Sequence, residues 1–215
     1  MVSFGNTFIL GDSYSTFEDY IPEGYAPHYK KAGREETDVD KVEQTWWYQL
    51  LGETNSTLVR NCSYSGTTVC HTGYNEEDFS HISFIARLDK LIDKNYFKEN
   101  IIDTIIIFGG TNDSWANSPI GELKYSDWSN EDLYYVLPAF CYLLYQISAN
   151  IPNAKVFCIM NNDLKTDIQE GFKKACEKNS VSFIELYEID KTYGHPTIKG
   201  MKQIKDQIIE YIKRL

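Results

Sequence analysis

The chain has 215 residues and a net charge of −10, from 21 basic and 31 acidic side chains. Hydrophobic residues make up 42% of it and aromatic residues 14%, which predicts a packed core and excludes global disorder. The acidity argues against nucleic acid or an anionic membrane surface as a partner, because phosphate groups are bound by basic surfaces. The length is typical of one domain, and we expect a single domain over residues 1–215.

The expected location is the cytoplasm. No apolar run approaches the ~20 residues needed to cross a bilayer. Residues 1–10 lack the basic region and long apolar stretch of a signal peptide. A secreted or periplasmic protein would need a leader that was removed upstream.

Five cysteines occur at irregular spacings, without a CxxC motif. They are Cys62, Cys70, Cys141, Cys158 and Cys176. We expect them to be reduced and in or near the core, as suits a reducing compartment. No Cys/His spacing indicates zinc, and no metal or cofactor is expected.

Apolar runs alternate with helical patterns along the chain. Strands are predicted at residues 7–10, 57–61, 104–108, 155–160 and 181–186. Helices are predicted at residues 44–51, 82–97, 131–150, 163–178 and 197–215. Pro138 predicts a kink or a late start in the third of these helices. The alternation predicts a three-layer α/β/α sandwich with a five-stranded parallel sheet.

Polar residues suited to acyl transfer follow several of these strands. Ser13 lies in the run Gly-Asp-Ser-Tyr-Ser, and Gly66 follows the second strand. Asn112 lies in Gly-Gly-Thr-Asn-Asp, and His195 lies in Gly-His-Pro near the chain's end. The carboxyl ends of parallel strands meet at one edge of a sheet, so these residues should lie together. Serine and histidine can serve as nucleophile and base, while glycine N–H and asparagine amide groups can stabilise an oxyanion.

In this order the four residues resemble the SGNH hydrolases, also called the GDSL esterase/lipase family, over residues 11–200. The resemblance implies a flavodoxin-like fold, with Ser13 as nucleophile and His195 as general base. It also implies an oxyanion hole made by the backbone N–H groups of Ser13 and Gly66 and the side chain of Asn112. Tyr14 stands where the family usually has leucine, and we expect this change to affect packing more than chemistry.

The acidic member of the expected triad departs from the family pattern. The family places it three residues before the histidine, where this chain has Thr192. The nearest carboxylates are Asp190 and Glu188. Either Asp190 reaches the imidazole through a bulge and acts as the catalytic acid, or a backbone carbonyl orients the ring and leaves a Ser–His dyad.

The predicted loops at this edge are rich in aromatic residues, namely Tyr14, Phe17, Tyr20, Tyr25, Tyr29, Tyr74, Trp115, Tyr125 and Trp128. Flat rings suit stacking on sugars, but they can equally pack long loops onto a domain. No strongly apolar lid is evident.

The sequence thus predicts hydrolysis of a carboxylic ester, with a short acyl group such as acetyl on a carbohydrate or similar small molecule. The alternatives are a thioesterase or lysophospholipase of the same family. A further alternative is a non-catalytic binding module on this fold, which the missing acid at Thr192 would favour.

Overall fold

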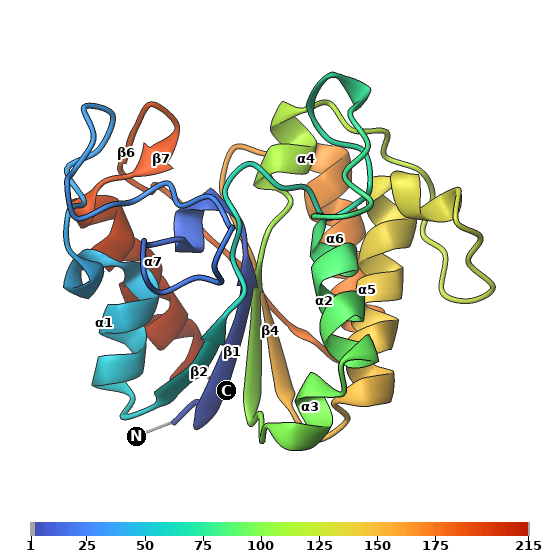
Figure 1. The fold of residues 1–215 in the computed structure, drawn as a ribbon, viewed down its shortest axis with the longest axis horizontal. Helices are drawn as coiled ribbons and strands as arrows, with labels where there is room; N and C mark the ends of the chain where they lie inside the picture. The colour runs from blue at the N-terminus through green and yellow to red at the C-terminus, as the bar shows by residue number, and fades with distance from the viewer. Residues whose placement is uncertain (1–2, 215) are drawn as a thin grey trace.

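A five-stranded parallel sheet lies between two layers of helices in the computed structural model, which describes residues 3–214 (Figure 1). The strand order is β2-β1-β3-β4-β5. This is the flavodoxin-like order, in which ligands bind beyond the carboxyl ends of the strands. The predicted three-layer α/β/α fold is confirmed.

The strands of the sheet are β1 (Asn6–Gly11), β2 (Thr57–Asn61), β3 (Thr104–Phe108), β4 (Lys155–Met160) and β5 (Ser182–Glu185). Strand β1 pairs with β3 from Thr7 opposite Thr104 to Gly11 opposite Phe108. The carboxyl ends of the two central strands are therefore level, and the loops that leave them start side by side.

One face of the sheet is covered by α1 (Trp46–Glu53) and α7 (Ile198–Ile212), and the other by α2 (Phe84–Asp93), α5 (Val136–Asn150) and α6 (Thr166–Lys178) (Figure 1). The two remaining helices are α3 (Tyr96–Glu99) and the short α4 (Thr111–Trp115), which follows β3. A small antiparallel hairpin, β6 (Lys191–Thr192) and β7 (His195–Pro196), precedes α7.

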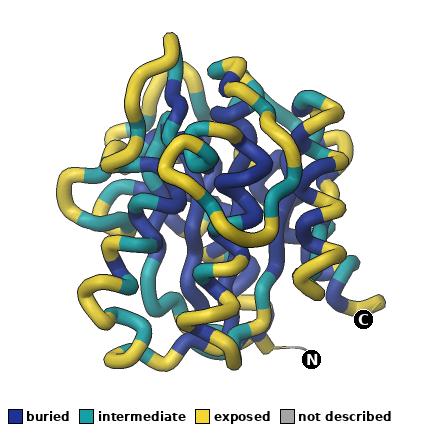
Figure 2. The backbone as a smooth tube through the Cα atoms, turned by 90° about the vertical axis from the view of Figure 1, so that its right-hand side faces the viewer, coloured by how far each residue is buried: buried dark blue, intermediate teal, exposed yellow. Residues whose placement is uncertain are grey.

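The central strands are buried on both faces, which explains their continuous apolar runs. Ile105 and Ile107 pack into the core beneath α2 and α5, while Ile106 and Phe108 pack into the core beneath α1 and α7. The buried strands at the centre and the exposed outer turns are visible in Figure 2. All five cysteines are buried and free, as predicted.

All five predicted helices begin or end at other residues in the structure, and two of them differ most. The helix expected at 82–97 is divided into α2 and α3, because Asn95 adopts a left-handed conformation with φ 57°. The helix expected at 131–150 starts late, after a 3₁₀ turn at Asp132–Tyr134. Pro138 consequently lies in the first turn of α5, where its missing N–H breaks no helical hydrogen bond.

Within residues 3–214, no helix is both long enough and apolar enough to pass through a bilayer.

Candidate active site

Ser13 and His195 meet at the carboxyl edge of the sheet. Ser13 opens a 3₁₀ turn (Ser13–Ser15) directly after β1, and the Asp12 carboxylate caps this turn by accepting the N–H of Tyr14 at 3.0 Å. His195 is the first residue of β7. The Nε2 atom of His195 lies 2.9 Å from the Oγ atom of Ser13, a hydrogen-bond distance across 182 residues of chain.

His195 is presented by the tight turn of the β6–β7 hairpin. Thr192 and His195 are paired across the hairpin, and Tyr193 and Gly194 form the two-residue connection. Their φ angles of 47° and 78° are both positive, as a type I′ turn requires. The residue at the family's acid position, Thr192, is thus the cross-strand partner of the histidine. The sequence analysis did not predict this hairpin.

The backbone of the hairpin fixes the tautomer of His195. The Nδ1 atom of His195 lies 3.1 Å from the carbonyl oxygen of Tyr193. A carbonyl can only accept, so Nδ1 carries the hydrogen and Nε2 presents its lone pair to the hydroxyl of Ser13. Burial lowers the pKa of His195, and the hydrogen bond to Tyr193 partly opposes that shift. The ring is therefore in the neutral form and the tautomer that a general base needs.

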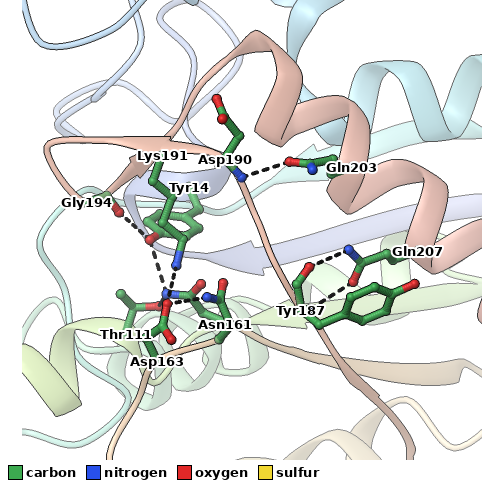
Figure 3. A network of polar contacts seen from close by, with 11 residues as sticks. Tyr14, Thr111, Asn161, Asp163, Tyr187, Asp190, Lys191, Gly194, Gln203 and Gln207 are labelled. Atoms are coloured by element: carbon green, nitrogen blue, oxygen red, sulfur yellow. Dashed lines mark hydrogen bonds and ion pairs between the residues drawn. The ribbon is translucent and has the colours of Figure 1, made fainter.

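Of the two alternatives for orienting the imidazole, the backbone carbonyl is the one present at Nδ1, and the described residues show no hydrogen bond between Asp190 and His195. The Asp190 carboxylate accepts the hydroxyl of Thr197, the N-cap of α7, and lies 3.5 Å from the ammonium of Lys199. The Thr197 hydrogen bond holds the pKa of Asp190 below its ordinary value. The Asp190 backbone N–H donates to Gln203 on α7 (Figure 3). Asp190 therefore anchors the start of α7.

Unused N–H groups lie around the serine. Neither the Ser13 N–H nor the Gly66 N–H has an acceptor among the residues that the structure describes. Gly66 has φ 79°, a conformation that favours glycine. The Asn112 amide donates one hydrogen to the Thr67 carbonyl at 3.0 Å, which places Asn112 beside Gly66. Its second amide hydrogen has no acceptor among the described residues.

Asn112 is oriented from both sides. Its Oδ1 atom accepts the hydroxyl of Tyr74 at 2.7 Å. The next residue, Asp113, is buried and accepts the N–H groups of Val69 and Cys70 at 2.9 Å and 3.2 Å. Burial raises the pKa of Asp113 to about 6. These contacts tie α4 to the segment that follows Gly66.

A buried arginine that the sequence analysis missed joins the strand ends. The Arg87 guanidinium donates to the carbonyls of Gly11 and Cys62 and to the hydroxyl of Thr67. It thereby connects the ends of β1 and β2 with the loop that carries Gly66. In the sequence this residue stands out only because it places a charged side chain on the otherwise apolar face of α2, next to Leu88.

Two buried tyrosines hold the backbone on either side of His195. The Tyr14 hydroxyl donates to the Gly194 carbonyl and accepts the amide of Asn161 at 3.1 Å (Figure 3). The Tyr29 hydroxyl donates to the Pro196 carbonyl at 3.1 Å. Tyr14 therefore contributes more than packing, because its hydrogen bond to the Gly194 carbonyl fixes the backbone next to His195.

The aromatic residues of the rim differ in how far they are buried. Tyr14, Phe17 and Tyr29 are fully buried and pack the loops onto the domain. Trp115 is 43% exposed, and its ring centroid lies 5.7 Å from that of His195. Trp115 thus offers an accessible flat surface next to the serine–histidine pair.

Other features of the molecule lie away from this edge. A cavity of about 460 Å³ is lined by Thr104, Lys155 and Ser182, the first residues of β3, β4 and β5, and so lies at the opposite edge.

Over residues 3–214, the histidine, cysteine and carboxylate side chains form no group of three or more that could bind a metal.

A flavodoxin-like sheet with serine, glycine, asparagine and histidine at its carboxyl edge defines the SGNH class of hydrolases. The GDSL-like lipase/acylhydrolase family matches residues 6–212, and the chain belongs to this family. In general terms it is an ester hydrolase.

Solved structures agree with this assignment. A Bacteroides ovatus protein assigned to the GDSL-like lipases has a TM-score of 0.92 and 44% identity over all of both chains. A Bacteroides uniformis protein with the same assignment has a TM-score of 0.90 and 41% identity, over 98% of this chain and 97% of its own. A family two carbohydrate esterase from Clostridium thermocellum, solved with cellohexaose, has a TM-score of 0.60 and 16% identity, over 100% of this chain and 65% of its own. This last likeness is one of fold alone. No curated protein matches the chain.

Proposed function

We propose that the chain hydrolyses small carboxylic esters, with an acyl group of about acetyl size on a carbohydrate or a similar alcohol. Ser13 is the nucleophile and His195 the general base. The observation that carries this proposal is the 2.9 Å contact between Ser13 Oγ and His195 Nε2. The carbonyl of Tyr193 supports it by selecting the tautomer whose Nε2 can accept the serine proton.

The reaction proceeds in two acyl transfers. Ser13 Oγ attacks the acyl carbon while its proton passes to His195 Nε2. The tetrahedral intermediate collapses as His195 returns that proton to the leaving alkoxide, which departs as the alcohol. A water molecule then gives a proton to His195 and attacks the acyl-serine. As this second intermediate collapses, His195 returns the proton to Ser13 Oγ, the bond from the acyl carbon to Oγ breaks, and the carboxylic acid is released.

The negative charge of each tetrahedral intermediate falls on the former carbonyl oxygen. The free N–H groups of Ser13 and Gly66 and the free amide hydrogen of Asn112 are suited to receive it. Because Asn112 is held by Thr67 and Tyr74 before substrate binds, little reorganisation is needed during the reaction.

The preference for a carbohydrate ester rests on Trp115. Its exposed ring beside His195 gives a sugar a flat surface to stack on. The carbohydrate esterase from Clostridium thermocellum, which was solved with cellohexaose, shares the fold and is compatible with this preference.

The test compares wild type with Ser13→Ala on acetylated monosaccharides and on p-nitrophenyl acetate, butyrate and octanoate. We expect Ser13→Ala to lower kcat on the order of 10³-fold or more, with an unchanged melting curve. Ser15→Ala is the matched control, since Ser15 lies in the same turn and its buried hydroxyl has no hydrogen-bond partner. Near-full activity of Ser13→Ala would overturn the assignment.

The same panel, extended with an acyl thioester and a fluorophosphonate probe, separates the alternatives. Activity that rises with acyl chain length would favour a lysophospholipase, and a preference for acyl thioesters would favour a thioesterase. Absence of Ser13 labelling by a fluorophosphonate, together with no turnover of any ester, would indicate a binding module.

A further inference from the structure

A second histidine, His28, lies flat against His195. The two ring centroids are 3.6 Å apart and the ring planes differ by 9°. His28 belongs to the long loop between β1 and α1, far from His195 in sequence. The contact therefore exists only in the folded chain. It covers one face of the His195 imidazole, and the edge of the same imidazole points toward Ser13.

The backbone of His28 is firmly held. Its N–H donates to the Thr16 hydroxyl at 2.8 Å, and its carbonyl accepts from Arg34 at 3.3 Å. Its ring packs edge-on against Tyr29, whose hydroxyl also holds the Pro196 carbonyl. His28 is 7% exposed, and its Nε2 atom is buried with no hydrogen-bond partner among residues 3–214.

We propose that His28 is a positioning residue for His195. Its neutral ring keeps the plane of the His195 imidazole aligned with Ser13, and its π face stabilises the imidazolium that forms when Ser13 gives up its proton. This inference rests on the proposed function of Ser13 and His195. In a serine triad a carboxylate both orients the histidine and supports its positive charge. Here the Tyr193 carbonyl and the His28 ring together orient His195, and the face of the His28 ring stabilises its positive charge.

The electrostatic surroundings keep His28 neutral. Burial, followed by the neighbouring His195 and Arg34, lowers the pKa of His28 to about 3. The charged groups that act on the His195 ring are Arg34 and Lys191, both of which lower its pKa. A second positive charge at His28 would be strongly unfavourable here. A neutral aromatic face attracts a cation instead.

The test compares two apolar replacements of similar bulk, His28→Phe and His28→Leu. Phenylalanine keeps an aromatic face over His195, whereas leucine fills the space without one. We expect kcat on p-nitrophenyl acetate to be about fivefold or more higher in His28→Phe than in His28→Leu, with similar KM values. His71→Ala is the control, because the His71 ring contacts Ser83 and Tyr134 and has no contact with His195.

A second readout does not depend on activity. NMR titration of the His195 ring should give a higher pKa in His28→Phe than in His28→Leu, because only phenylalanine favours the imidazolium. If wild type hydrolyses no ester, the proposed function fails, while this titration still decides the role of the stack. Equal pKa values of His195 in the two variants, or equal kcat values in an active enzyme, would overturn the proposal.

Discussion

The carbonyl oxygen of Tyr193 lies 3.1 Å from Nδ1 of His195, at the atom that a triad carboxylate would contact. A carbonyl orients the imidazole as a carboxylate does, but it carries only a partial charge. Hydrogen bonds to ionised groups are roughly twice as strong as neutral ones. We therefore propose that Ser13 and His195 act as a dyad, in which the hairpin backbone orients the imidazole.

The first prediction concerns Asp190. Asp190→Asn should change kcat by less than about threefold, whereas the comparable change in a serine-protease triad costs about 10⁴. Asparagine retains an oxygen that can accept the Thr197 hydroxyl, so the start of α7 should be preserved. The measurement is kcat near pH 8, with His195→Ala as the inactive reference. A loss of a hundredfold or more would restore Asp190 as the catalytic acid.

Asn112→Ala should lower kcat by roughly 10²–10³ with little change in KM, because an oxyanion donor acts mainly in the transition state. Tyr74→Phe is the companion variant, since it removes only the hydroxyl that orients Asn112 and should cost much less. A raised KM with normal kcat in Asn112→Ala would instead make Asn112 a residue for ground-state binding.

Tyr14→Phe should damage both stability and turnover. It removes the hydroxyl that joins the Gly194 carbonyl to the Asn161 amide, and leaves the partly buried carbonyl and the buried amide without this partner. The free energy of unfolding should fall by about 1–3 kcal/mol. Displacement of the His195 hairpin should lower kcat on the order of tenfold.

The matched control is Tyr187→Phe, because the Tyr187 ring is exposed and its hydroxyl lies 3.5 Å from Glu210. Denaturant unfolding and steady-state kinetics measure the two effects. Unchanged stability and kcat in Tyr14→Phe would show that the hairpin holds its position without this hydroxyl.

The last prediction concerns Asp12 and pH. Burial raises the pKa of Asp12 from its ordinary value of 3.8 to about 7, and its Oδ2 atom has no hydrogen-bond partner in the described part of the chain. Between these pH values the folded state binds more protons than the unfolded state. The stability from Asp12 is therefore complete below pH 3.8 and is lost as the pH rises through 7, by up to about 1.4 kcal/mol per pH unit.

Asp12→Asn mimics the protonated acid and should remove this loss. The check is the free energy of unfolding of both proteins from pH 4 to pH 8. Taking the difference removes the slopes that both proteins share, namely the opposite slope from the depressed pKa of His28 and the slope of the same sign from the raised pKa of Asp113. Curves that stay parallel over this range would show that Asp12 does not titrate as its burial implies.

Local patterns were enough to predict the architecture. The apolar run at residues 104–108 predicts a strand buried on both faces, and Ile105, Ile106, Ile107 and Phe108 alternate between the two cores as a parallel sheet requires. Helix ends were less well predicted, because a left-handed Asn95 or a proline in a first turn depends on the neighbouring packing. The separation of α2 from α3 shows that dependence.

The sequence by itself determined the sheet, and it determined that Ser13, Gly66, Asn112 and His195 follow strands whose carboxyl ends share one edge. The tertiary structure alone decided what surrounds the histidine. Tyr193 reaches His195 through a two-residue turn, and His28 reaches it from a distant loop. Contacts of these two kinds depend on the three-dimensional paths of the loops, and no periodic pattern in the sequence predicts them. For the same physical reason Asp190 lies near His195 in sequence but bonds to Thr197 in the fold.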